Sequence, residues 1–157
     1  MDFSNLFNDA LSAALKDINS GRFALQSEKD LQSIIFHHAL LLVDESVHQI
    51  GIHAEPTKAG LRPDLVFGQD EVFVEIKLSK SGIGGYTQAL ESWKSDVKKL
   101  KAYKEKWPDA RCVFLAIDES GYHSDPLKQN FFDPVVNQLQ GNWQKFINNK
   151  RILIADA

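Results

Sequence analysis

The sequence has little of several features that mark large classes of protein. Its single cysteine, Cys112, excludes an internal disulfide and is typical of a reducing, cytoplasmic setting. No apolar run approaches the roughly 20 residues that a membrane-spanning helix needs; the run at residues 39–43, for example, ends at Asp44. The first five residues carry no basic segment, so a secretory signal is not expected. These absences favour a cytoplasmic protein with no membrane partner.

Positive charge is also scarce. The chain has 18 Lys and Arg residues against 21 Asp and Glu residues, a formal net charge of -3. Binding to nucleic acid through overall charge is therefore not expected, although a local basic face can still contact a phosphate backbone. The glycine-rich residues 79–85 lack the spacing of a nucleotide-binding loop, and His37 and His38 lack the spacing of a zinc site. Neither nucleotide binding nor zinc binding is predicted.

What is present is enough for one globular domain over residues 1–157. The chain is 43% hydrophobic and 25% charged, and it has no repeat or low-complexity segment. Helical periodicity and strand alternation follow each other along the chain, which predicts an α/β fold. Helices are expected at residues 2–18, 27–43, 86–107 and 132–147, and strands at 46–56, 65–67, 72–78, 111–118 and 152–154. The first helix is expected to cover the sheet, with self-association as the alternative.

The stretch from Arg62 to Lys80 carries the strongest functional signal. Two apolar runs, residues 65–67 and 72–74, flank a glycine-containing turn, which predicts a β-hairpin. Alternation along the second strand gives a core face and an opposite face; the core face holds Val72, Val74, Ile76 and Leu78, and the opposite face holds Phe73, Glu75 and Lys77. Asp64 opens the first strand, so the hairpin brings it level with Glu75 and Lys77. Two carboxylates and a lysine are therefore expected to converge.

Such a cluster suits metal-assisted hydrolysis of a phosphodiester. Two neighbouring carboxylates repel each other unless a cation lies between them, and oxygen ligands alone favour magnesium or manganese. Lys77 could orient or deprotonate an attacking water and stabilise the charge that develops on the phosphate. The alternative is structural: Glu75 and Lys77 form the solvated face of an edge strand, and Asp64 only begins its neighbour.

These residues also resemble a known family. Pro63 and Asp64, followed across the hairpin by Glu75, Ile76 and Lys77, are similar to the P-D…(D/E)-x-K signature of the PD-(D/E)XK nuclease superfamily, which has the restriction-endonuclease-like fold. The resemblance implies a mixed β-sheet core of order α-β-β-β-α-β over residues 27–118. An additional helix in residues 1–20 would precede this core, and a C-terminal helix and strand would follow it. It also implies a magnesium or manganese ion held by Asp64, Glu75 and the carbonyl of Ile76, with Lys77 as the catalytic lysine.

Further site residues follow from the same resemblance. Glu28, at the start of the second helix, resembles a glutamate that related nucleases direct at the metal; the equal alternative is that it serves only the helix terminus. Gln88 resembles a glutamine that several branches place beside the substrate, although the Q-x-x-x-Y form is absent because Ser92 occupies its last position. Glu55 is a weaker candidate for a further acid, since a glutamate before a proline at a strand end is usually solvated.

Lysines are the candidates for contact with the substrate. Lys80, in the glycine-rich loop, and Lys94, Lys98 and Lys101, on the long helix, are expected to contact the phosphate backbone; the alternative is a solubilising helix face. The expected function is a nuclease acting on nucleic acid, with DNA endonuclease activity first. A dimeric, structure-selective resolvase of Holliday-type junctions and a non-cleaving binding or assembly module of the same fold are the alternatives. RNA as the substrate and a homodimer stay open.

Overall fold

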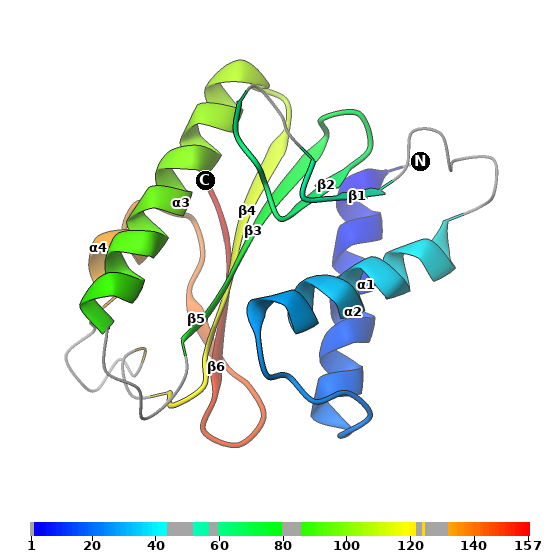
Figure 1. The fold of residues 1–157 in the computed structure, drawn as a ribbon, viewed down its shortest axis with the longest axis vertical. Coiled ribbons are helices and arrows are strands. Elements are labelled where there is room, and N and C mark those ends of the chain that lie inside the picture. Colours follow the sequence, from blue (N-terminus) through cyan, green and yellow to red (C-terminus); the bar gives the residue numbers. More distant parts are fainter. Residues whose placement is uncertain (1, 44–51, 57–59, 80–85, 122–123, 125–131) are drawn as a thin grey trace.

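The fold is a mixed β-sheet between two layers of helices (Figure 1). The computed structural model describes residues 2–43, 52–56, 60–79, 86–121, 124 and 132–157, apart from the side chains of 86–88. The helices are α1 (Phe3–Asn19), α2 (Glu28–Leu42), α3 (Tyr86–Lys106) and α4 (Asp133–Val136). The strands are β1 (Ile52–Ala54), β2 (Leu65–Phe67), β3 (Val72–Ser79), β4 (Arg111–Asp118), β5 (Trp143–Lys145) and β6 (Arg151–Asp156).

The six strands lie in the order β1-β2-β3-β4-β6-β5. Strands β3 and β4 are parallel, and the other neighbouring pairs are antiparallel. Helices α1 and α2 cover one face of the sheet, and α3 and α4 cover the other (Figure 1). The predicted α/β class is confirmed, with a mixed sheet flanked by helices. Within the part of the chain that the structure describes, no helix combines the length and apolar character needed to cross a membrane.

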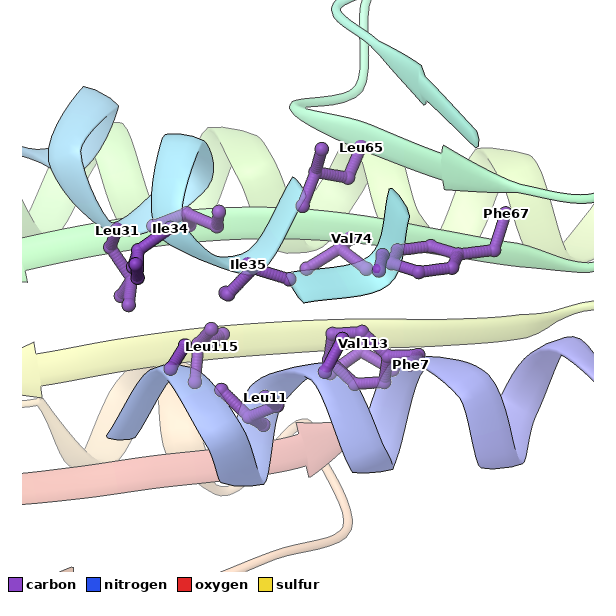
Figure 2. Packing of buried hydrophobic residues seen from close by; sticks show 14 of the residues in the cluster. Phe7, Leu11, Leu31, Ile34, Ile35, Leu65, Phe67, Val74, Val113 and Leu115 are labelled. Carbon is purple, nitrogen blue, oxygen red and sulfur yellow. The ribbon is translucent and has the colours of Figure 1, made fainter. Parts of the chain in front are cut away.

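The two N-terminal helices begin where capping residues allow them to begin. Asp2 accepts the backbone N–H of Asn5 at the start of α1, and Ser27 and Asp30 form a reciprocal capping box at the start of α2. The apolar side of each helix packs on the sheet, with Phe7 of α1 and Ile35 of α2 among the buried side chains in Figure 2. Helix α1 therefore covers a face of the sheet beside α2, as predicted.

The predicted hairpin is confirmed, with Leu65 opposite Val74 and Phe67 opposite Val72. Gly68 has φ +67° in its turn, and a Cβ there would lie 2.6 Å from the ring of Phe3, so the turn needs a glycine. The alternative in which Glu75 and Lys77 form the solvated face of an edge strand is wrong, because β3 lies between β2 and β4. Helix α3 covers that face, because the side chains of Trp93 and Leu100 pack against strand residues there. Phe73 and Glu75 are buried as a result.

The C-terminal part departs from its predicted structure. The helix expected at residues 132–147 ends at Val136, and Trp143 to Lys145 form an edge strand beside β6. Gln140 exchanges two backbone hydrogen bonds with Asp156, of 2.8 and 2.9 Å. A Cβ on Gly141 would lie 2.6 Å from the carbonyl oxygen of Ile154, so the backbone packs directly against β6. Pairing with β6 thus overrides the helical spacing of the apolar residues.

The remaining strand predictions hold where the structure describes them. The strand at 111–118 is β4, and the one expected at 152–154 extends over Arg151–Asp156. Of the strand expected at 46–56, Ile52–Ala54 is β1, and residues 46–51 lie outside the described residues. Residues 119–130 are polar with glycine and proline, which predicts a loop, and most of them lie outside the described residues as well.

Candidate active site

The candidate site begins at the edge of β3, beyond the point where β2 stops. Strand β2 pairs with β3 only as far as Val74. Past that point Asp64 Oδ2 accepts the N–H of Ile76 at 2.7 Å, and Glu28 Oε1 accepts the N–H of Leu78 at 3.2 Å. Two carboxylates, one from the start of β2 and one from the start of α2, thus take the hydrogen bonds that a longer β2 would have made.

On the α3 side of β3, charged side chains alternate in sign. Lys77 Nζ lies 2.7 Å from Asp96 Oδ2 and 3.8 Å from Glu28 Oε2. Lys99 Nζ lies 3.1 Å from Asp96 Oδ1 and 2.9 Å from Glu75 Oε1. Each oxygen of Asp96 therefore holds one lysine, and the chain of contacts runs from Glu28 to Glu75. With Asp64 added, these residues are the acid–lysine cluster: Glu28, Asp64, Glu75, Lys77, Asp96 and Lys99.

Negative charge is in excess in this cluster. Its four carboxylates and two ammonium groups leave a formal charge of about -2 when all are ionised. Burial, together with the charges of Asp64 and Asp96, raises the pKa of Glu75 to about 8, even with Lys99 beside it. Burial likewise raises the pKa of Asp64 and of Glu28. The acids are thus short of positive charge.

The pKa values of the two lysines are raised as well, which for a lysine favours the charged form. Burial alone would lower the pKa of Lys77, but contact with Asp96 outweighs it and the pKa is raised. The same balance, with Glu75 as the main partner, raises the pKa of Lys99. Both ammonium groups therefore keep their proton at neutral pH.

Three buried polar atoms of this region lack a hydrogen bond of normal geometry from the described residues. They are Glu75 Oε1, Asp96 Oδ2 and the hydroxyl of Tyr103. Lysines approach the first two closely, so these contacts are ionic more than directional. Burial raises the pKa of Tyr103, and the charges of Glu75 and Asp64 add to the effect. Buried polar atoms are normally satisfied, and two of these three depend on the lysines for their partner.

Magnesium or manganese fits the cluster in donor type and charge. Its acids offer oxygen ligands only, which magnesium and manganese prefer. A divalent ion would balance the formal charge of about -2. A buried oxygen of Glu75 also lacks a hydrogen bond of normal geometry. The carboxylates are not, however, spaced as a finished ligand set: among the described residues no three His, Cys, Asp or Glu side chains are grouped to hold a metal ion. Ammonium groups lie between them instead.

The structure brings four predicted residues together: Glu28, Asp64, Glu75 and Lys77. Glu55 is not in the cluster, since it forms an exposed ion pair with Lys29 that lowers its pKa. Lys80 lies outside the described residues, as does the side chain of Gln88.

The three lysines predicted on the long helix lie apart from the cluster. At about 100° of rotation per residue, Lys94, Lys98 and Lys101 share a flank of α3 that lies about 100–160° around the helix from Lys99. Lys94 pairs with Glu91 at 3.0 Å, and Lys101 donates to Gln138, just after α4, at 2.9 Å. Their predicted contact with substrate therefore requires a ligand wide enough to reach both flanks of α3.

Two cluster residues were missed by reasoning from the sequence, namely Asp96 and Lys99. A signal for Asp96 was available, because it lies in the apolar stripe of α3 with Trp93, Val97 and Leu100. An acid at a core-facing helical position needs a buried partner. Lys99 follows from Asp96, since it lies three residues further on the same helix.

Comparisons of the chain with protein-family models, with curated proteins and with solved structures give no significant match.

Proposed function

We propose that the chain is a metal-dependent nuclease of the PD-(D/E)XK type, which hydrolyses phosphodiester bonds of nucleic acid, with DNA as the first substrate to test. One observation carries the proposal. Asp64, Glu75 and Lys77, singled out by their spacing, lie in a single charged cluster with Glu28 and with an excess of negative charge. That combination of acids, lysine and net charge suits a hard divalent ion beside a phosphate.

The arrangement of elements supports the same proposal. The order α2, β1, β2, β3, α3, β4 is the order that the PD-(D/E)XK resemblance implies. The hairpin β2–β3 carries the motif, and the connection through α3 returns the chain to β4, parallel to β3. The acids lie where α2, the hairpin and α3 meet, so elements of all three layers contribute to the site.

Asp64, Glu75 and the carbonyl of Ile76 are the ligands we assign to the ion. The N–H of Ile76 bonds to Asp64, and in an extended strand the N–H and C=O of one residue leave toward the same edge. The carbonyl of Ile76 therefore faces the Asp64 side of β3. A bound magnesium or manganese ion would polarise the phosphate and lower the pKa of an attacking water.

Lys77 supplies a fixed positive charge at the site. Asp96 and Glu28 hold its ammonium group from two sides, and Ser92 Oγ accepts a hydrogen bond from it at 3.3 Å. Because its pKa is raised, the lysine does not serve as a general base at neutral pH. Its role in the proposal is to orient water and to stabilise the charge of the reacting phosphate.

Calorimetric titration with manganese and a cleavage assay test the proposal. We expect heat of binding, a melting temperature that rises with the manganese concentration, and metal-dependent cutting of plasmid DNA or of an RNA transcript. The double variant Asp64→Asn/Glu75→Gln should lose all three responses. Glu55→Gln, which removes an exposed acid near the site, is the matched control and should keep them. Absence of metal binding by the unmodified protein would overturn the proposal.

A second candidate, a non-cleaving nucleic-acid-binding or assembly module, is favoured by the ion pairs of the cluster. Lys77 and Lys99 already provide Asp96 and Glu75 with partners, so the fold can accommodate these acids without a metal. This candidate predicts binding of nucleic acid with no heat from manganese and no cleavage.

A further inference from the structure

The ammonium group of Lys99 lies against a carboxylate oxygen of Glu75. Glu75 is one of the assigned metal ligands, and it needs a free oxygen to bind the ion. The Lys99 nitrogen lies 2.9 Å from Glu75 Oε1, while the side chain of Glu75 is only 2% exposed and that of Lys99 is 26% exposed. We propose that Lys99 is an internal counter-ion of the site, displaced from Glu75 by a divalent cation and then retained by Asp96. This inference rests on the proposed function, because it takes Glu75 as a ligand of the ion.

The contacts of Lys99 make such an exchange feasible. The contact with Glu75 lacks the geometry of a directed hydrogen bond, so little directional bonding is lost when the ammonium group moves. Asp96 Oδ1 already lies 3.1 Å from the same nitrogen. Lys99 therefore stays paired after leaving Glu75, and no buried charge is left without a partner.

The charge balance gives the exchange its direction. An ammonium group and a divalent cation repel each other strongly at the separations within one carboxylate cluster. The ion with two charges gains more from the excess negative charge of the cluster than Lys99 does. Lys99 thus lowers the affinity for metal in the free protein and keeps Glu75 partly neutralised until an ion arrives.

The proposal extends to the substrate. A phosphate backbone near the cluster offers a new anionic partner to the displaced lysine. Nucleic acid and metal would then favour each other's binding by the same factor, since linkage between two ligands is reciprocal. The site would hold its metal weakly when empty of substrate and tightly when nucleic acid is bound.

The test is the dissociation constant for manganese, measured by calorimetry on the full chain. Lys99→Met removes the ammonium group and is expected to tighten binding at least about tenfold, or about 1.4 kcal/mol. Lys98→Met removes an exposed charge from the next position of α3 and is expected to change the constant by less than about twofold. Lys77→Met removes a charge from the same cluster without touching Glu75, so its effect should be smaller than that of Lys99→Met.

The expected change is tighter manganese binding by Lys99→Met. Damage to the fold would weaken binding, so it would not be mistaken for the expected result. If Lys99→Met binds manganese no more tightly than the unmodified protein, the inference is wrong while the proposed function stands. If neither protein binds manganese, both are wrong.

A measurement on the unmodified protein covers the case in which the variant does not fold. Magnesium is titrated while the ¹³Cε signals of the lysines are followed by NMR. The inference expects the Lys99 signal to shift with saturation and the Lys98 signal to stay in place. A Lys99 signal that does not respond to saturating magnesium would overturn it.

Discussion

If the proposed function is right, replacing Lys77 should separate catalysis from metal binding. Its ammonium group contacts Asp96, Glu28 and Ser92, and no ion pair joins it to Asp64 or Glu75. Lys77→Ala is therefore expected to lower the turnover number by at least about a hundredfold while manganese still binds. Single-turnover cleavage and calorimetry on the same preparation check this, with Lys16→Ala, at an exposed position of α1, as the surface control. Loss of metal binding together with cleavage would instead make Lys77 part of the structure of the metal site.

Asp64 has two roles that two substitutions can separate. Asp64→Asn keeps an acceptor for the N–H of Ile76 and removes one of the excess negative charges, so metal binding should fall while stability changes little. Asp64→Ala also removes the acceptor, which is expected to cost about 1–3 kcal/mol of unfolding free energy. Urea denaturation without divalent ions measures the difference. Equal stability of the two variants would show that the hydrogen bond to Ile76 contributes nothing measurable.

The raised pKa of Glu75 predicts that the unfolding free energy depends on pH in an unusual way. Its pKa is about 8 in the folded chain, against 4.5 for an ordinary glutamate, so the folded state binds more protons between these values. Without divalent ions, the unfolding free energy should therefore fall as pH rises through this range, by at least about 1.4 kcal/mol, the equivalent of one pKa unit. Asp64 and Glu28 act in the same direction, because their pKa values are raised too.

Glu75→Gln should flatten this dependence, measured by urea denaturation between pH 5 and about 8.5. Glu55→Gln is the control, because the pKa of Glu55 is lowered and its effect on stability lies at more acidic pH. Equal slopes for the unmodified protein and Glu75→Gln would contradict the prediction.

At the level of single residues, the local pattern could locate only part of the cluster. Alternation along β3 and the hairpin register place Glu75, Lys77 and Asp64 together, and both are properties of neighbouring sequence. The positions of Asp96 and Lys99 depend on how α3 is rotated over the sheet, which is set by tertiary packing. Asp96 could be recognised as a buried acid, but its lysine partner on β3 could not.

Among the elements, α3 carries charge on two flanks with different expected roles. One flank presents Lys99 to the cluster, and the other carries Lys94, Lys98 and Lys101. Neutralising these three lysines is expected to weaken binding of duplex DNA several-fold and to reduce the slope of log affinity against log salt by up to about 0.9 per lost contact. Turnover at saturating substrate should change little, because this flank lies away from the acids.

Filter binding with a Glu75→Gln background, which should not cleave, measures the slope. Lys16, in the last turn of α1 on the other face of the sheet, is the control position for a neutral substitution. An unchanged salt slope for the triple variant would mean that this flank of α3 is only a solvated surface.

Helices and strands with a strong local sequence pattern were predicted well. Segments whose structure depends on pairing with a strand distant in the sequence were not. The apolar run of β4 and the amphipathic pattern of α3 gave boundaries within a residue or so of the observed ones. After Val136, the spacing of apolar residues fits a helix. In the structure, however, those residues belong to a turn and to the edge strand β5, which pairs with β6. Gly141, where a Cβ has no room, was the local sign of that close approach.

For the whole molecule, the site lies at a junction of layers. Glu28 comes from α2 on one side of the sheet, and Asp96 and Lys99 come from α3 on the other. Both faces of β3 are buried between them, so the acids are held by the two packed cores of the protein. The geometry of the cluster therefore depends on the complete α/β/α packing, and a fragment without α3 would lack Asp96 and Lys99.

Beyond Val74, no strand among the described residues pairs with the β2 side of β3, which has a consequence for how copies of the chain behave toward one another. An unpaired strand edge is a template on which a second chain can add a strand and begin aggregation. Asp64 and Glu28 occupy the N–H groups of Ile76 and Leu78, and their charge repels the carbonyl groups of an approaching backbone. Asp64→Leu/Glu28→Leu should therefore form thioflavin-positive aggregates at concentrations where Asp64→Asn/Glu28→Gln stays monodisperse by light scattering. Both acids would be needed to keep this edge closed whether or not the chain cuts nucleic acid.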